Sequence, residues 1–117
     1  RSGIRIHMDD DKVVLTLTTP AEQQIVFDDD KGEVLLKDKN GNSLRMDSGG
    51  ITIECCDTLS IKTKGSTRLD VGSNAELKSA TGTEIKAGTS IKLEGSAGAE
   101  LSSPAVTQVK GSLVQIN

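Results

Sequence analysis

The chain has 117 residues, a formal net charge of −3 and a single aromatic residue, Phe27. A conventional globular core is disfavoured, because such cores depend on aromatic side chains that each bury about 150–250 Å². Disorder is disfavoured too, because Val, Ile and Leu are plentiful and the charges nearly cancel. Nucleic-acid binding is disfavoured because the chain has neither a basic stretch nor aromatic residues for base stacking. A fold of thin, regularly repeated layers remains.

The N-terminal half repeats at a spacing of 19 residues, at which Met8, Phe27 and Met46 recur. Each of these residues belongs to a strand-like segment and is followed by Asp, a turn and a second strand. The second strands are expected at 13–18, 33–37 and 51–54. The turns contain Asp-Lys-Gly, Asn-Gly and Ser-Gly-Gly, which favour hairpins. We therefore predict that residues 1–50 form strand-turn-strand repeats that lead into a shaft.

A stricter repeat of eight residues occupies the C-terminal half. The positions that recur are all aliphatic: Ile53, Ile61, Leu69, Leu77, Ile85, Leu93, Leu101 and Val109. Residues two positions before and after them are small or aliphatic, and the residues between are mostly polar, which is the alternation of a half-buried strand. Gly, Ser and Asn separate these segments and permit sharp bends. Each octad therefore predicts one short strand and one corner.

One strand cannot bury its apolar side alone, so stacked octads predict a prism with the aliphatic row along its axis. Two architectures satisfy the period: one chain coiled on itself as a solenoid, or three chains intertwined. Composition favours the second, because one large aliphatic residue flanked by small ones suits a narrow shared axis. We therefore predict an all-β fold, an intertwined homotrimeric β-helix whose octad needle spans residues 51–117. A Gly-rich β-sandwich would not keep so strict a period.

The acidic runs, His7 and the two cysteines are the candidate chemical sites, and each has a simpler interpretation. The acidic runs 9–11 and 28–30 lack the EF-hand spacing and are expected in turns or at solvated edges. His7 is the only histidine, and nothing marks a nucleophile or a pocket beside it, so we expect an exposed strand residue. No catalytic, cofactor or metal site is predicted, and the protein is not expected to be an enzyme.

The two cysteines, Cys55 and Cys56, are adjacent. Neighbouring strand residues point to opposite faces, so a disulfide between them would be strained. Cys55 is in register with Thr63 and Val71 and should face the axis, whereas Cys56 should lie near a corner or the outer surface. Copies of Cys55 in a trimer would then be small buried groups, with interchain disulfides or a three-thiolate metal site as the alternatives.

The sequence resembles the C-terminal needle of the central spike proteins of contractile injection machines, which include VgrG-type spikes of type VI secretion, contractile phage tails and phage-tail-like particles. The resemblance covers about residues 20–117. It is carried by residues 24–32, 39–42 and 48–53, the octads from Leu59 to Val109, and the end from Lys110 to Asn117. It implies an intertwined homotrimer of triangular cross-section.

The resemblance also implies partners and a role. The blunt end of such a needle carries a PAAR-repeat cap or an effector, and hub and tube proteins of the machine lie upstream. By the same analogy a tip platform consists of Leu113, Val114, Gln115, Ile116 and Asn117. The chain lacks the His-x-His motif with which some phage spikes bind iron at the tip, so a separate cap is expected.

The function predicted from the sequence is therefore a structural, membrane-piercing spike. No signal-peptide pattern is visible, so we expect assembly in the cytoplasm of the producing cell, followed by ejection or incorporation into a baseplate. The alternative is a trimeric fibre or adhesin shaft for surface or carbohydrate attachment. That alternative expects exposed aromatic residues that stack on sugars, and the chain has almost none.

Overall fold

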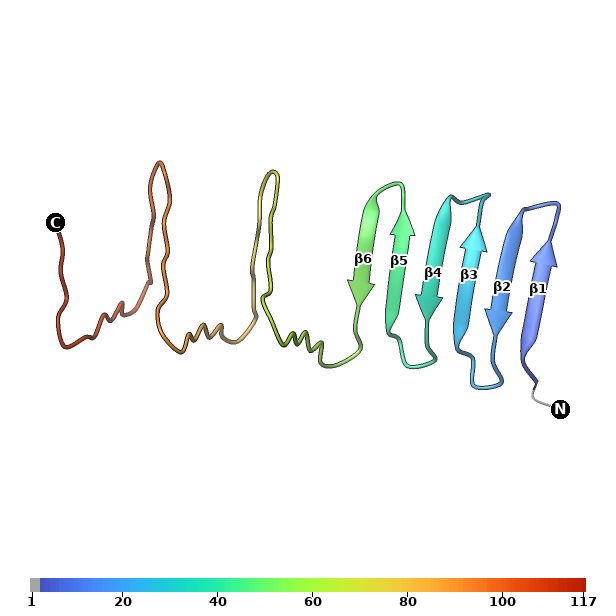
Figure 1. Ribbon diagram of the computed structural model, residues 1–117, viewed down its shortest axis with the longest axis horizontal. Coiled ribbons are helices and arrows are strands. Elements are labelled where there is room, and N and C mark those ends of the chain that lie inside the picture. Colours follow the sequence, from blue (N-terminus) through green and yellow to red (C-terminus); the bar gives the residue numbers. More distant parts are fainter. Residues whose placement is uncertain (1–2) are drawn as a thin grey trace. The chain divides into compact units, whose positions relative to one another are not determined.

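The computed structural model describes residues 3–117, and the first two residues of the predicted N-terminal repeats lie outside this range. The chain is all-β and consists of two compact units, residues 1–68 and 69–117. The first unit contains six antiparallel strands that pair in chain order as a meander (Figure 1). Their bounds are β1 Arg5–Asp9, β2 Val14–Thr18, β3 Gln24–Asp28, β4 Glu33–Lys37, β5 Ser43–Asp47 and β6 Gly50–Glu54.

The predicted 19-residue repeat corresponds to hairpins. The residues Met8, Phe27 and Met46 lie in β1, β3 and β5, the first strand of each hairpin. The second strands β2, β4 and β6 agree with the expected ranges, except that Val13 belongs to the turn and Gly50 to the strand. Two residues fewer separate Asp47 from its partner Gly50 than separate Asp28 from its partner Glu33. The third hairpin is therefore the tightest.

An aspartate closes each of these turns, at the same 19-residue spacing. The Oδ1 atom of Asp9 accepts hydrogen bonds from the backbone N–H groups of Asp11 and Lys12, at 3.1 and 3.3 Å. Asp28 accepts one from Lys31 at 3.0 Å and Asp47 one from Gly49 at 2.8 Å. Aspartate is favoured at such positions because its short side chain reaches the backbone of the next few residues. These contacts confirm the turn interpretation of the acidic runs.

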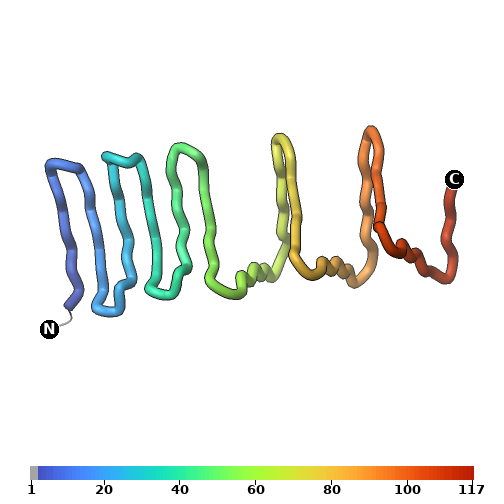
Figure 2. Tube along the Cα trace, turned by 180° about the vertical axis from the view of Figure 1, so that it is seen from behind, coloured from blue at the N-terminus to red at the C-terminus, as the bar shows by residue number. Residues whose placement is uncertain are grey.

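The chain beyond β6 has no ladder of its own. It bends sharply at eight-residue intervals, at residues 56–57, 64–65, 72–73, 80–81, 88–89, 96–97, 104–105 and 112–113, as the trace shows (Figure 2). Each bend follows the predicted axis position by three residues, as the octad repeat requires. Within the described chain, no residue from 55 to 117 forms a β-bridge. The octads are therefore extended segments whose backbone groups lack a partner strand from the same chain.

Hydroxyl groups join the two sides of some corners. The Thr63 Oγ1 and Thr67 Oγ1 atoms lie 3.2 Å apart across one corner, and Ser79 Oγ lies 2.8 Å from Thr83 Oγ1 across another. Ser79 also donates a hydrogen bond to the carbonyl oxygen of Gly82 at 2.7 Å. The hydroxyl groups on either side of these two corners therefore face each other.

Candidate self-association surface

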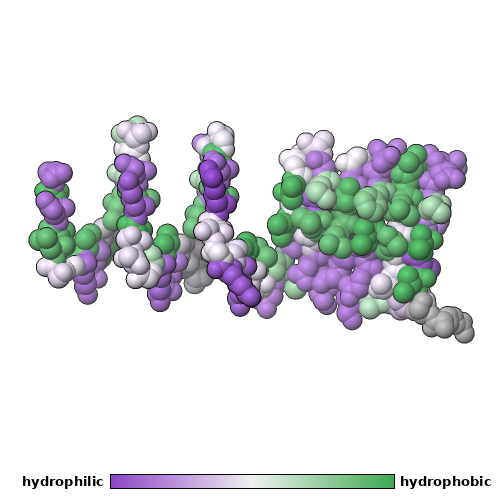
Figure 3. All heavy atoms as spheres, viewed as in Figure 1, coloured by the Kyte–Doolittle hydropathy of each residue, from purple (hydrophilic) through white to green (hydrophobic). Residues whose placement is uncertain are grey.

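The six-stranded sheet has one face made entirely of apolar side chains. The strand register places two of them from every strand in the same two rows, because alternate residues of a strand point to the same side. The members are Ile6, Met8, Leu15, Leu17, Ile25, Phe27, Val34, Leu36, Leu44, Met46, Ile51 and Ile53. We call this set the apolar face. In Figure 3 it forms a band across the strands with hydrophilic residues above and below.

No residue of the described range 3–117 buries this face. Among residues 3–117 no hydrophobic side chain is buried, and Met8, Phe27 and Ile53 expose 72%, 45% and 60% of their surface. The accessible surface totals 11486 Å². A folded monomer of 12.3 kDa is expected to expose only about 6,100 Å². The described residues therefore have the strand pattern of a half-buried sheet but no buried core.

The predicted axis residues are also solvent-exposed. Ile53 is part of the apolar face, and the others lie at the middle of successive segments between bends. The exposure of the eight residues ranges from 60% at Ile53 to 91% at Leu93. The assignment of these eight residues to a trimer axis remains a prediction.

Charged side chains occupy the opposite side of the octads. Glu76 and Lys78 flank Leu77 and form an ion pair of 3.0 Å, and Glu84 and Lys86 pair at 2.9 Å around Ile85. Lys92 and Glu94 repeat the arrangement at 3.4 Å around Leu93. Residues two apart in an extended chain project to the same side. These three axis positions therefore lie between charged residues that point away from them.

The predicted tip residues begin within the last bend, at 112–113, and continue beyond it. Leu113 and Ile116 expose 81% and 89% of their surface, and Val114 exposes 49%. Gln115 and Asn117 are exposed as well. Three apolar residues thus lie open at the end of the described chain, but their role as a platform stays a prediction.

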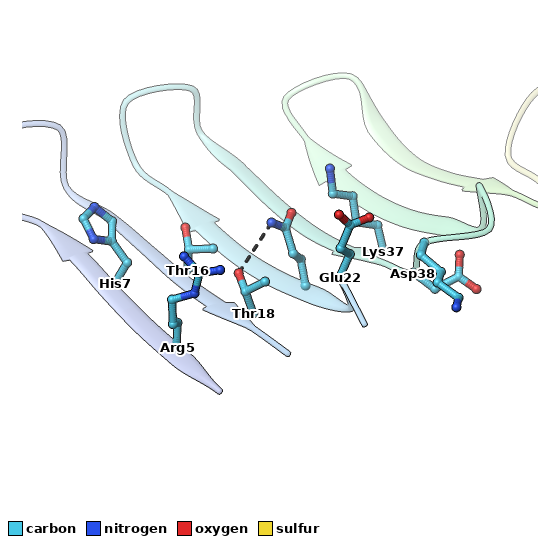
Figure 4. A pocket seen from close by; sticks show the side chains of 9 residues that line it. Arg5, His7, Thr16, Thr18, Glu22, Lys37 and Asp38 are labelled. Atoms are coloured by element: carbon cyan, nitrogen blue, oxygen red, sulfur yellow. Dashed lines mark hydrogen bonds between the residues drawn. The ribbon is translucent and has the colours of Figure 1, made fainter. Parts of the chain in front are cut away.

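His7 lies on the polar face of the sheet, in an open hollow of about 680 Å³ that Arg5, Thr16, Thr18 and Gln24 also line (Figure 4). The Gln24 Nε2 atom donates a hydrogen bond to Thr18 Oγ1 at 3.5 Å, a long contact. Lys37 lines the same hollow from β4, with β2 and β3 between it and Arg5 of β1. The cations Arg5 and Lys37 therefore do not converge on one point.

The remaining candidates are the two adjacent cysteines. Cys55 and Cys56 are exposed free thiols. No cluster of three His, Cys, Asp or Glu residues within residues 3–117 is arranged to hold a metal ion. In the same range no helix is long and apolar enough to cross a membrane. The surface with the clearest organisation is thus the apolar face, together with the aliphatic row of the octads.

A comparison with protein families identifies what this organisation belongs to. The family described as the phage baseplate V C-terminal trimerisation domain matches residues 12–117. The chain belongs to this family. A search of curated proteins gave no match.

Membership agrees with the resemblance to a spike fragment, and it gives the domain a structural role in a baseplate. The family description also accounts for the uncovered apolar surface, since a trimerisation domain supports self-association as a homotrimer. Sequence reasoning did not identify Asp38 and Asn42, which organise the turn between β4 and β5. The Asp-Lys-Asn-Gly-Asn sequence of that turn was the available signal.

Proposed function

We propose that three copies of this baseplate trimerisation domain intertwine into a rigid spike shaft that pierces a membrane during injection. The observation that carries the proposal is that the side chains with the apolar pattern of a protein core are exposed in the single chain. The chain has an unbroken apolar face and a strict aliphatic row, yet exposes nearly twice the surface expected of a folded monomer. Hydrophobic burial is the main driving force of association, so covering this surface would supply the missing core.

The backbone of the octads favours intertwined chains over a single-chain solenoid. A solenoid would pair each octad with another of the same chain, and residues 55–117 form no such bridge. Backbone N–H and C=O groups must find partners when they are removed from water. Strands from two other copies would provide those partners while the aliphatic residues pack along the axis.

The outward charges suit such a shaft. The pairs Glu76–Lys78, Glu84–Lys86 and Lys92–Glu94 each join one acidic and one basic side chain, and these side chains expose most of their surface. Charged side chains on an outer surface keep strands from pairing edge to edge with other molecules. A loop-poor shaft of this kind transmits compressive force, which is the mechanical requirement of a piercing device.

The C-terminal end would serve as the platform of the spike. Its exposed residues Leu113, Val114 and Ile116 offer three apolar groups per chain, and three copies would multiply them. We propose that a PAAR-type cap or an effector docks there, and that upstream hub and tube proteins hold the other end. The domain would assemble in the producing cell and then be ejected or remain in the baseplate.

Light scattering of the purified chain tests this proposal. The expected mass is about three times that of the 12.3 kDa chain, because each shaft requires three copies. Bands of trimer that survive boiling in detergent are expected as well, since intertwined chains separate only by unwinding. A monomeric mass across the micromolar range would refute the proposal.

A further inference from the structure

The turn between β4 and β5 is built around one carboxylate. The Oδ1 atom of Asp38 accepts hydrogen bonds from the backbone N–H groups of Asn40 and Asn42, at 2.9 and 3.0 Å. Its Oδ2 atom accepts hydrogen bonds from the side-chain amides of the same two residues, at 3.2 Å from Asn40 Nδ2 and 2.8 Å from Asn42 Nδ2. The order of this turn therefore depends on two side-chain amides that must remain intact.

The two asparagines differ in their exposure and in the residue that follows. Asn42 is half-buried, precedes a serine and accepts the N–H of Cys56 through its Oδ1 atom at 2.8 Å. Asn40 is exposed and precedes Gly41, which is exposed as well and has a φ of 98°. Residues with a Cβ atom rarely adopt this φ, so the turn favours glycine after Asn40. Asp38 accepts the N–H groups on either side of Gly41 but not that of Gly41 itself.

An exposed Asn-Gly pair has a route to lose its side-chain amide without an enzyme. The backbone nitrogen of Gly41 gives its proton to water or hydroxide and bonds to Cγ of Asn40, and the bond from Cγ to Nδ2 breaks. The amide nitrogen leaves as ammonia, and a cyclic imide remains. Water then opens the ring at either carbonyl, which yields aspartate or isoaspartate. The reaction consumes water and needs no oxidant, and glycine favours it because no Cβ atom obstructs the approach of its nitrogen.

We propose that Asn40 is a site of spontaneous deamidation, and that the carboxylate formed there loosens the turn between β4 and β5. The product no longer donates a hydrogen bond to Asp38 Oδ2, and it places a second negative charge beside that carboxylate. A nearby like charge disfavours the ionised form, so the pKa of Asp38 should rise from about 2. Asn42, which joins Asp38 to Cys56, would then be held less firmly.

Peptide mass spectrometry tests the first part of the inference. The whole chain is aged in mildly alkaline buffer, both native and unfolded in guanidinium, and fragment ions assign each deamidation to a residue. In the native protein we expect Asn40 to react about tenfold faster than Asn42 or Asn74, which both precede a residue with a Cβ atom. Unfolding should leave the Asn40 rate within the same order of magnitude, because this residue is already exposed. A native rate no faster than that of Asn74, or strong protection by the native structure, would overturn the inference.

Two variants test the effect on the turn. Asn40→Asp copies one product of the reaction. Asn40→Ala is its matched control, because both variants remove the Nδ2 donor but only the first adds a charge. In carbon NMR the pKa of the Asp38 carboxyl should be higher in Asn40→Asp than in Asn40→Ala. Equal values in the two variants would overturn the second part of the inference. Neither result depends on the number of chains in the assembly, so the proposed function is tested separately by light scattering.

Discussion

The side chain of Asn42 accepts a hydrogen bond from the backbone N–H of Cys56, with 2.8 Å between Oδ1 and N. The same side chain donates to Asp38 Oδ2 at 2.8 Å through its Nδ2 atom. The backbone N–H of Asn42 donates to Asp38 Oδ1 at 3.0 Å. One amide therefore joins the turn after β4 to the chain that leaves β6. This joint fixes where the sheet ends and the first bend begins.

Replacement of Asn42 by Ala should loosen this joint. The variant removes the acceptor of the Cys56 N–H and one partner of Asp38, and each neutral hydrogen bond contributes about 0.5–1.5 kcal/mol. We expect the free energy of unfolding to fall by about 1–3 kcal/mol per chain, measured by circular dichroism at fixed protein concentration. Asn40→Ala is the matched control, because Asn40 contacts Asp38 but does not reach Cys56. An equal loss in both variants would contradict the assigned role of Asn42.

The same contacts predict how Asp38 titrates. Hydrogen bonds from the Asn42 side chain and backbone, and smaller contributions from Asn40, lower the pKa of Asp38 from 3.8 to about 2. The native state therefore releases this proton more readily than the unfolded chain. The resulting stabilisation is complete above pH 3.8 and is lost as the pH falls towards 2. Carbon NMR of the Asp38 carboxyl should show this pKa, and Asn42→Ala should shift it back towards 3.8; an unchanged value would contradict the assignment.

Backbone strain distinguishes the first hairpin from the second. Val13 has a φ of 51° and Gly32, 19 residues later, has a φ of 62°, so both occupy the left-handed region at the end of a turn. A β-branched residue is unfavourable there, at a cost of about 1–3 kcal/mol, whereas Gly adopts it freely. Val13→Gly should therefore raise the midpoint of denaturation relative to Val13→Ala, which removes the side chain but keeps a Cβ. Equal midpoints would show that the turn is not strained.

A charge in the aliphatic row should prevent assembly. Leu93→Asp would place three carboxylates beside one dry axis in the proposed trimer, and burial of an unpaired charge is strongly unfavourable. We expect a monomer by light scattering and loss of the β signal in circular dichroism. Lys92→Gln is the control, because Lys92 is predicted to lie on the outward side with Glu94. This variant should assemble normally. A normal trimer from Leu93→Asp would mean that the predicted register is wrong.

The sequence predicts the positions of bends and strands better than it predicts their contacts. The period of eight located the corners because each octad repeats the same alternation of apolar and polar residues, independent of its neighbours. The spacing of Met8, Phe27 and Met46 located the first strand of each hairpin for the same reason. Both signals are periodic patterns within short segments, and such patterns can be recognised in a single sequence.

Contacts over longer distances were not predictable in this way. The bond from Asn42 to Cys56 joins residues 14 apart in the sequence, and no periodicity marks it. The strained conformation of Val13 could not be predicted from the sequence either. Val is a residue type that favours strands, and Val13 was expected to begin the strand at 13–18. The turn geometry overrides that preference, since Val13 accepts a backbone hydrogen bond from Asp29 of the next hairpin at 3.0 Å.

The regular bends have a consequence for how such a molecule changes length. A bend recurs after every eight residues, and the same face returns each time. An insertion or deletion of whole octads would therefore preserve the register of everything that follows. An odd number of residues would turn the aliphatic row to the opposite side, and any number that is not a multiple of eight would displace the bends. In a stacked shaft each added strand would lengthen the rod by about 4.8 Å. The length of the shaft could therefore be changed one octad at a time, by selection or by design, without altering the register of the remaining octads.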